Sequence, residues 1–182
     1  VAAAEHYAEA LARDPDDAML LERTLLHRLA AGQVAEAVPV ARRVDEVSPG
    51  GHLYVVALAA EEIRTGAHAR AAGRLAAEED RRGRFVVGLM EAWAELGAGD
   101  RAGALAVLDA LEEDGAGGPA GRFLAGFHRG LVFAAEGDDE GAVRALENAR
   151  EEAGSLPRRL ALALSGALAR LGRTDEAGAV LE

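Results

Sequence analysis

The sequence predicts an all-α protein in which antiparallel helix pairs follow one another along the chain. Aromatic residues make up only 4% of the 182 residues, and the hydrophobic half of the composition shows no sustained alternation typical of strands. Alanine, leucine, glutamate and arginine, which favour helices, dominate instead. Glycines that end helical stretches recur at separations of 34, 33, 38 and 35 residues. These glycines are Gly32, Gly66, Gly99, Gly137 and Gly172.

Each of these glycines fits the position just after a helix, where the backbone adopts a positive φ that penalises a Cβ. An alanine follows five positions later in every case. These alanines are Ala37, Ala71, Ala104, Ala142 and Ala177. Because a small side chain one turn into the next helix lets two antiparallel helices approach closely, each unit is predicted to be helix, tight turn, helix.

Polar residues shortly after three of the glycines are candidates for the N-cap of the second helix. They are Asp100, Asp138 and Thr174. Side-chain oxygens of these residue types accept hydrogen bonds from the free backbone N–H groups of a first helical turn. The second helices are therefore predicted to begin directly after these residues.

The period, the turn glycine and the following alanine resemble the tetratricopeptide repeat, in which about 34 residues form one helix pair. The second helix of that repeat typically reads Ala-x3-aromatic-x2-Ala-Leu-x3-Pro. The start of the chain matches this pattern with Ala3, Tyr7, Ala10, Leu11 and Pro15. The resemblance covers essentially the whole chain. It implies a right-handed superhelix of helix pairs that binds a protein or peptide segment.

The spacing predicts a single repeat array over residues 1–182. Residues 1–15 resemble a second helix, so we expect the protein to continue upstream with the matching first helix. Helix pairs are expected at 18–49, 52–82, 85–114, 120–153 and 157–182. The glycine-rich segment 114–121 is expected to be a flexible boundary. Pro39 is expected to bend the second helix of the first complete pair, because proline removes a backbone donor.

The charge of the chain narrows the class of partners. There are 31 acidic against 20 basic residues, and the formal net charge is −11. Phosphate binding needs a basic face, so this balance disfavours nucleic acid. No stretch reaches the roughly 18 apolar residues of a membrane-spanning helix, so no membrane insertion is expected.

Residue types that carry catalysis or bind metals are sparse or scattered. Cysteine is absent and every basic residue is arginine, which removes thiolate chemistry and Schiff-base lysines. The three serines lack a nucleophile-elbow context, and the five histidines are not clustered and read as surface or groove-edge residues. The acidic runs lack the spacing of a calcium loop. We therefore expect no enzymatic activity, no metal and no cofactor.

First helices line the inner surface in arrays of this kind, and the ligand is held there. Counting from the turn glycines places eight apolar residues on that surface. These groove candidates are Leu26, Leu29, Val56, Ile63, Leu89, Trp93, Phe127 and Leu131. The best-known charged groove of the family binds a terminal carboxylate through lysines and an asparagine. The corresponding positions here are Glu22, Val56, Leu89 and Phe127, so that ligand is not expected.

Trp93 is the only tryptophan and allows two interpretations. On the groove surface it would be a strong contact for a bound peptide. If Gly97 rather than Gly99 ends its helix, the side chain turns into the core, where most large apolar groups lie. Sequence alone leaves both interpretations open.

The primary hypothesis is a non-catalytic scaffold that binds an apolar or basic protein segment in its groove. One alternative is homo-oligomerisation, such as a homodimer, through the uncovered first helix and the apolar faces. Another is a regulatory helical-repeat domain of a larger enzyme. The segments ALARDPDD and GRTDEA also resemble small alphaproteobacterial tetratricopeptide proteins of the cell envelope. That resemblance implies a periplasmic or envelope location in preference to the cytoplasm.

Overall fold

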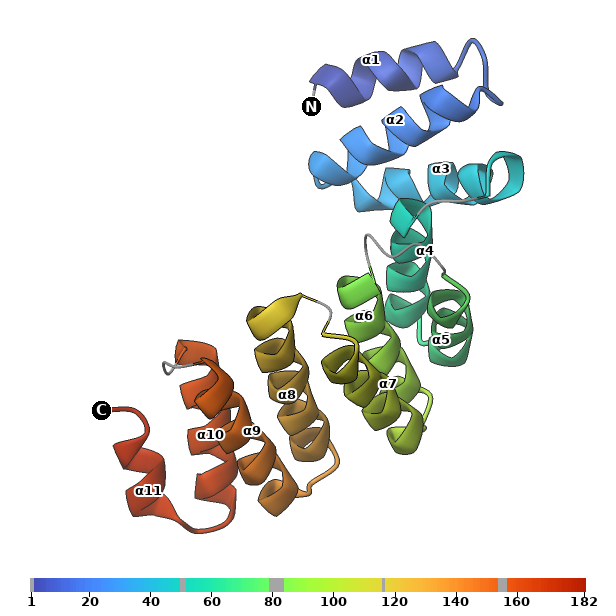
Figure 1. Cartoon of the computed structure of the whole chain (residues 1–182). Coiled ribbons are helices and arrows are strands. Elements are labelled where there is room, and N and C mark those ends of the chain that lie inside the picture. Colours follow the sequence, from blue (N-terminus) through green and yellow to red (C-terminus); the bar gives the residue numbers. More distant parts are fainter. Residues whose placement is uncertain (1, 50–51, 79–83, 116, 154–156) are drawn as a thin grey trace. The chain divides into compact units, whose positions relative to one another are not determined.

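The computed structural model describes residues 2–49, 52–78, 84–115, 117–153 and 157–182. Every regular element in these ranges is an α-helix, which confirms the predicted all-α class (Figure 1). The chain divides into two compact units, an N-terminal unit of residues 1–87 and a C-terminal unit of residues 88–182.

The N-terminal unit is a series of helices in which each packs against the next from α1 to α5. Its helices are α1 (Ala2–Leu11), α2 (Ala18–Ala30), α3 (Val34–Val47), α4 (His52–Arg64) and α5 (His68–Ala76), followed by the start of α6 (Arg84–Gly97). Leu21 and Leu25 of α2, Val44 of α3 and Leu75 of α5 are buried in its core.

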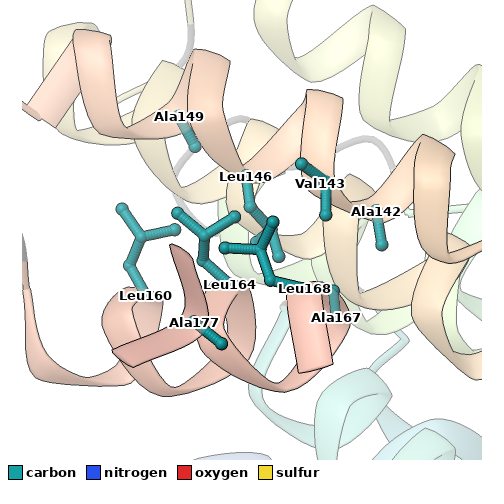
Figure 2. Close-up of a cluster of buried hydrophobic side chains, with 9 residues drawn as sticks. All are labelled: Ala142, Val143, Leu146, Ala149, Leu160, Leu164, Ala167, Leu168 and Ala177. Carbon is teal, nitrogen blue, oxygen red and sulfur yellow. The ribbon is translucent and has the colours of Figure 1, made fainter. Parts of the chain in front are cut away.

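The C-terminal unit is likewise a series of α-helices. It contains the remainder of α6, then α7 (Arg101–Glu113), α8 (Gly118–Ala135), α9 (Asp139–Ala153), α10 (Arg158–Arg170) and α11 (Thr174–Ala179). From α7 to α11 each helix packs against the next, and α8 also contacts α10. Figure 2 shows the apolar cluster between α9, α10 and α11, where Leu146 faces Leu164 and Leu168.

All five turn glycines have a positive φ, from 73° at Gly32 to 89° at Gly99, as predicted. At the end of α6, the N–H of Asp100 donates to the carbonyl of Glu95 at 2.9 Å, and the N–H of Gly99 donates to Leu96 at 3.0 Å. This pair of bonds is the Schellman motif, and the same pair closes the other four turns. Gly97 is the last residue of α6, and Gly99 is the turn glycine with the positive φ.

The alanine five residues after each glycine is buried, with an exposed fraction between 0% and 6%. Two of the predicted N-caps are confirmed, because Asp100 accepts from the N–H of Gly103 at 2.8 Å and Asp138 from Gly141 at 2.9 Å. The third prediction is wrong. Thr174 is the first residue of α11, and the N-cap position falls on Arg173, whose side chain pairs with Glu176 instead of capping the helix.

The helix α3 runs through Pro39 from Val34 to Val47, and the bend expected at this proline stays a prediction. The helix-pair limits also stay predictions, as does the flexible boundary at 114–121. Within that segment Gly117 has a φ of 79° and occupies the N-cap position of α8.

Candidate interaction surface

One side of each first helix remains outside the buried core. It consists of the positions 13, 10, 6 and 3 residues before the turn glycine, a spacing that places them on one side of an α-helix. No residue at these positions in α2, α4, α6, α8 or α10 is fully buried. We call this set the first-helix face.

The first-helix face is almost entirely apolar. Apart from Glu22 and Arg159, its residues are apolar side chains or glycine. Six large apolar side chains are exposed among the residues that the structure describes, and four of them belong to this face. Those four are Met19, Leu26, Val86 and Leu162. Apolar side chains left in water at equivalent places in successive repeats suggest a surface that contacts a partner.

The eight groove candidates all lie on the first-helix face. Leu26 is exposed and the other seven are half-buried. The N-terminal unit carries Leu26, Leu29, Val56 and Ile63, and the C-terminal unit carries Leu89, Trp93, Phe127 and Leu131. The sequence interpretation missed Met19, Val86 and Leu162, although the same count from the glycines would have found them.

In the C-terminal unit, Trp93 of α6 meets His128 of α8. The indole Nε1 donates a hydrogen bond to Nδ1 of His128 at 2.8 Å, and the two rings meet edge to face with centroids 6.0 Å apart. His128 also meets the ring of Phe127 at 5.7 Å, and Phe127 stacks on Phe123 at 6.1 Å. Trp93, a half-buried residue, therefore contacts the next first helix.

His128 is a functional candidate that the sequence interpretation did not single out. Its ring is half-buried, and this burial lowers the pKa of His128 below the ordinary value of 6.5. Because Nδ1 accepts the hydrogen bond from Trp93, the neutral ring carries its proton on Nε2. No feature of the sequence indicates this pairing, since it depends on how two helices 35 residues apart in sequence meet.

We expect the fluorescence of Trp93, the only tryptophan, to change as the pH falls below 6.5. An imidazolium has no acceptor at Nδ1, so protonation of His128 breaks the bond from Trp93. Because the pKa is lowered in the folded state, the stabilisation is complete above 6.5 and is lost as the pH falls through the folded value. Emission recorded between pH 8 and 5 measures this change.

The matched control for this titration is His128→Phe, which keeps an aromatic ring and removes the titrating group. Its emission should stay flat over the same range. A midpoint above 6.5 in the wild-type protein, or an unchanged titration in His128→Phe, would contradict the proposed pairing.

A cleft of about 520 Å³ lies on the opposite side of α8, between α7 and α9. Arginines and glutamates line it, and they neutralise one another. Arg129 donates to Glu112 at 3.0 Å and also pairs with Asp109, and Arg122 donates to Glu152 at 3.3 Å. None of the groove candidates lines this cleft. Because its arginines and carboxylates pair with one another, the cleft does not indicate a particular class of ligand.

Two further features bear on function. Within the part of the chain that the structure describes, no three His, Cys, Asp or Glu side chains come together as a metal site requires. Nor does any described helix combine the length and apolar character needed to cross a membrane.

Several solved structures share this architecture. YrrB, described as a TPR protein with an unusual peptide-binding site, superposes with a TM-score of 0.64 at 14% identity, over 98% of this chain and 90% of YrrB. MamA gives 0.66 at 16% identity, over 90% of this chain and 87% of MamA. A chain of the APC/C hetero-tetramer Cut9–Hcn1 gives 0.66 at 16% identity, covering 96% of this chain but 34% of that one.

No protein-family model matches the sequence, and neither does any curated protein. At these levels of identity the likeness to solved structures concerns the fold alone. The structure itself agrees with that likeness. The described ranges contain eleven helices, and five of these helices are followed by a turn glycine and then, five residues later, by a buried alanine. The chain therefore has the tetratricopeptide-repeat fold that its glycine and alanine spacing predicted.

Proposed function

We propose that the chain is a non-catalytic scaffold that binds a segment of another protein on its first-helix face. The observation that carries the proposal is that each unit keeps apolar side chains at the surface, in equivalent positions of its own first helices. YrrB, which shares the fold, has a peptide-binding site, and this supports the same class of function here.

Burial of the first-helix face would supply the affinity. Covering exposed leucine, valine and methionine side chains contributes roughly 25 cal/mol for each Å² of apolar surface removed from water. Leu162 alone keeps 54% of its surface exposed, so a bound partner can remove a large apolar area of this residue from water. A partner with a matching apolar strip would gain most from this contact.

The charges of the chain select against acidic partners. The formal net charge is −11, and long-range repulsion slows the approach of other anionic segments. Glu22 is exposed on the first-helix face of α2, at a position where a carboxylate-binding groove would need a cation. The partner segment is therefore neutral or basic around its apolar residues.

Peptide selection on the purified protein tests the proposal. Random peptides displayed on phage are selected on the wild type and then assayed on Leu131→Gln and Leu162→Gln, which leave the net charge unchanged. We expect both variants to weaken binding by about ten-fold, because a truncated apolar contact at an interface costs on the order of 1–2 kcal/mol. Circular dichroism checks that the variants keep their helicity.

Leu181→Gln is the matched control. Leu181 is 56% exposed, almost the same as Leu162, but it lies beyond α11 and off the first-helix face. It should bind the selected peptides as the wild type does. Equal binding by all variants would contradict the proposal. A dimer in light scattering that becomes a monomer in Leu162→Gln would instead assign the face to self-association.

A further inference from the structure

We infer that the segment bound by the C-terminal unit is an amphipathic α-helix rather than an extended strand. The inference rests on the proposed function and specifies the conformation and chemistry of its ligand. It follows from the hydrogen-bonding groups that the first-helix face of this unit offers.

The first-helix face of the C-terminal unit offers almost no hydrogen-bonding side chain. Its residues are Leu89, Trp93, Leu96, Leu124, Phe127, Leu131, Ala134, Arg159, Leu162, Gly166 and Ala169. The indole N–H of Trp93 is already donated to His128. Arg159 lies in the first turn of α10, at the edge of the strip.

The polar neighbours of the strip offer little more. The hydroxyl of Ser165 donates to the carbonyl of Ala177 at 2.9 Å, so its proton is engaged. His128 keeps one N–H, at Nε2, because Nδ1 is engaged by Trp93. The backbone groups of the first helices are used within the helices themselves.

An extended segment would find few hydrogen-bond partners for its backbone on such a surface. Its backbone N–H and C=O groups need partners, and those turned towards the apolar strip would lose water without gaining a bond. Each buried unpaired group costs about 1–3 kcal/mol. A helix satisfies its backbone internally and presents only side chains, so it can lay an apolar stripe on the surface without this loss.

The spacing of the first helices sets the expected length of the bound helix. Trp93 joins α6 to α8, and α8 packs against α10, so three first helices lie in succession. Helices that pack this way lie about 8–10 Å apart, so the strip spans about 16–20 Å. A helix rising about 1.5 Å per residue needs about 11–13 residues to cross it. Apolar residues would recur at i, i+3, i+4 and i+7.

A designed peptide tests the inference. The probe is a fluorescein-labelled peptide of about 14 residues built from leucine, glutamine and arginine, with leucines at the helical spacing just given. Its matched control is the diastereomer with two central residues as D-isomers, which breaks the helix but keeps composition and charge. Fluorescence anisotropy measures binding of both to the wild type, Leu162→Gln and Leu181→Gln.

We expect the all-L peptide to bind the wild type at least about ten-fold more tightly than its diastereomer. Leu162→Gln should weaken that binding and Leu181→Gln should not. Equal affinity for the two peptides, still reduced by Leu162→Gln, would overturn the helical ligand and leave the proposed function standing. Binding of the all-L peptide that Leu162→Gln does not change would contradict both.

Absence of binding by either peptide at high micromolar concentration would also overturn the helical ligand. The phage selection decides the proposed function independently, because it imposes no conformation on the ligand. Circular dichroism of any selected peptide in complex gives a second measure, since an extended bound conformation would contradict the inference.

Discussion

Replacing Gly130 with alanine is expected to destabilise the C-terminal unit by about 1–3 kcal/mol, although alanine favours helices more than glycine does. A Cβ at this position would lie 2.5 Å from Cγ and 2.6 Å from Cδ2 of Leu146. Leu146 is fully buried on α9 and packs within the cluster shown in Figure 2, so it cannot move aside freely. Urea unfolding measures the loss.

Gly126→Ala on the same helix is the matched control. Gly126 is also buried, but its added Cβ would lie 3.5 Å from Cβ of Ala149, an ordinary contact distance. This variant should gain about 0.5–1 kcal/mol from the better helix propensity of alanine. Two substitutions of the same chemistry are therefore expected to have opposite signs.

A double-mutant cycle identifies Leu146 as the obstacle. Leu146→Ala alone should cost about 2–5 kcal/mol, because it leaves a cavity in a closed cluster. In the double variant the new Cβ at position 130 no longer meets the leucine. The combined loss should therefore fall short of the sum by at least about 1 kcal/mol. Strict additivity would show that the strain at Gly130 arises elsewhere.

Pro39→Ala is expected to stabilise the N-terminal unit by about 1–3 kcal/mol. Pro39 lies inside α3 and is exposed, so its ring contributes little to the core. Its missing N–H leaves the carbonyl of Ala35 without the usual helical partner, and alanine would restore that bond. Urea unfolding followed by far-ultraviolet circular dichroism gives the free energy of unfolding.

Pro15→Ala provides the comparison. Pro15 is exposed in the turn between α1 and α2, where proline restricts the unfolded chain without interrupting a helix. Its replacement should cost about 0.4–1 kcal/mol through the entropy of the unfolded state. A change of the same sign in both variants would argue against helix interruption at Pro39.

The turns between paired helices were predictable because their causes are local. A glycine with positive φ, an alanine one turn later and an aspartate N-cap act within a few residues of one another. Thr174 shows the limit of this reasoning. Arg173 reaches Glu176 with its side chain, the helix begins one residue early, and nothing in residue type alone separates the two outcomes.

The candidate surface was predictable in position but not in detail. Counting from the glycines placed Leu26 and Leu131 on a face that stays partly exposed, because the helical period carries over from the turn. The bond between Trp93 and His128 could not be predicted, since it depends on side-chain rotamers and on the spacing of two helices. The close approach at Gly130 is of the same kind.

The Schellman turns have a consequence for how such a gene can change in length. Each first helix encodes its own stop, and the second helix of the same pair begins at a fixed distance after it. A tandem duplication of the codons for residues 138–172 would insert one complete pair, including a new glycine and another segment of apolar strip. Evolution could thus lengthen or shorten the ligand-binding surface in whole-pair steps, without re-optimising the existing turns.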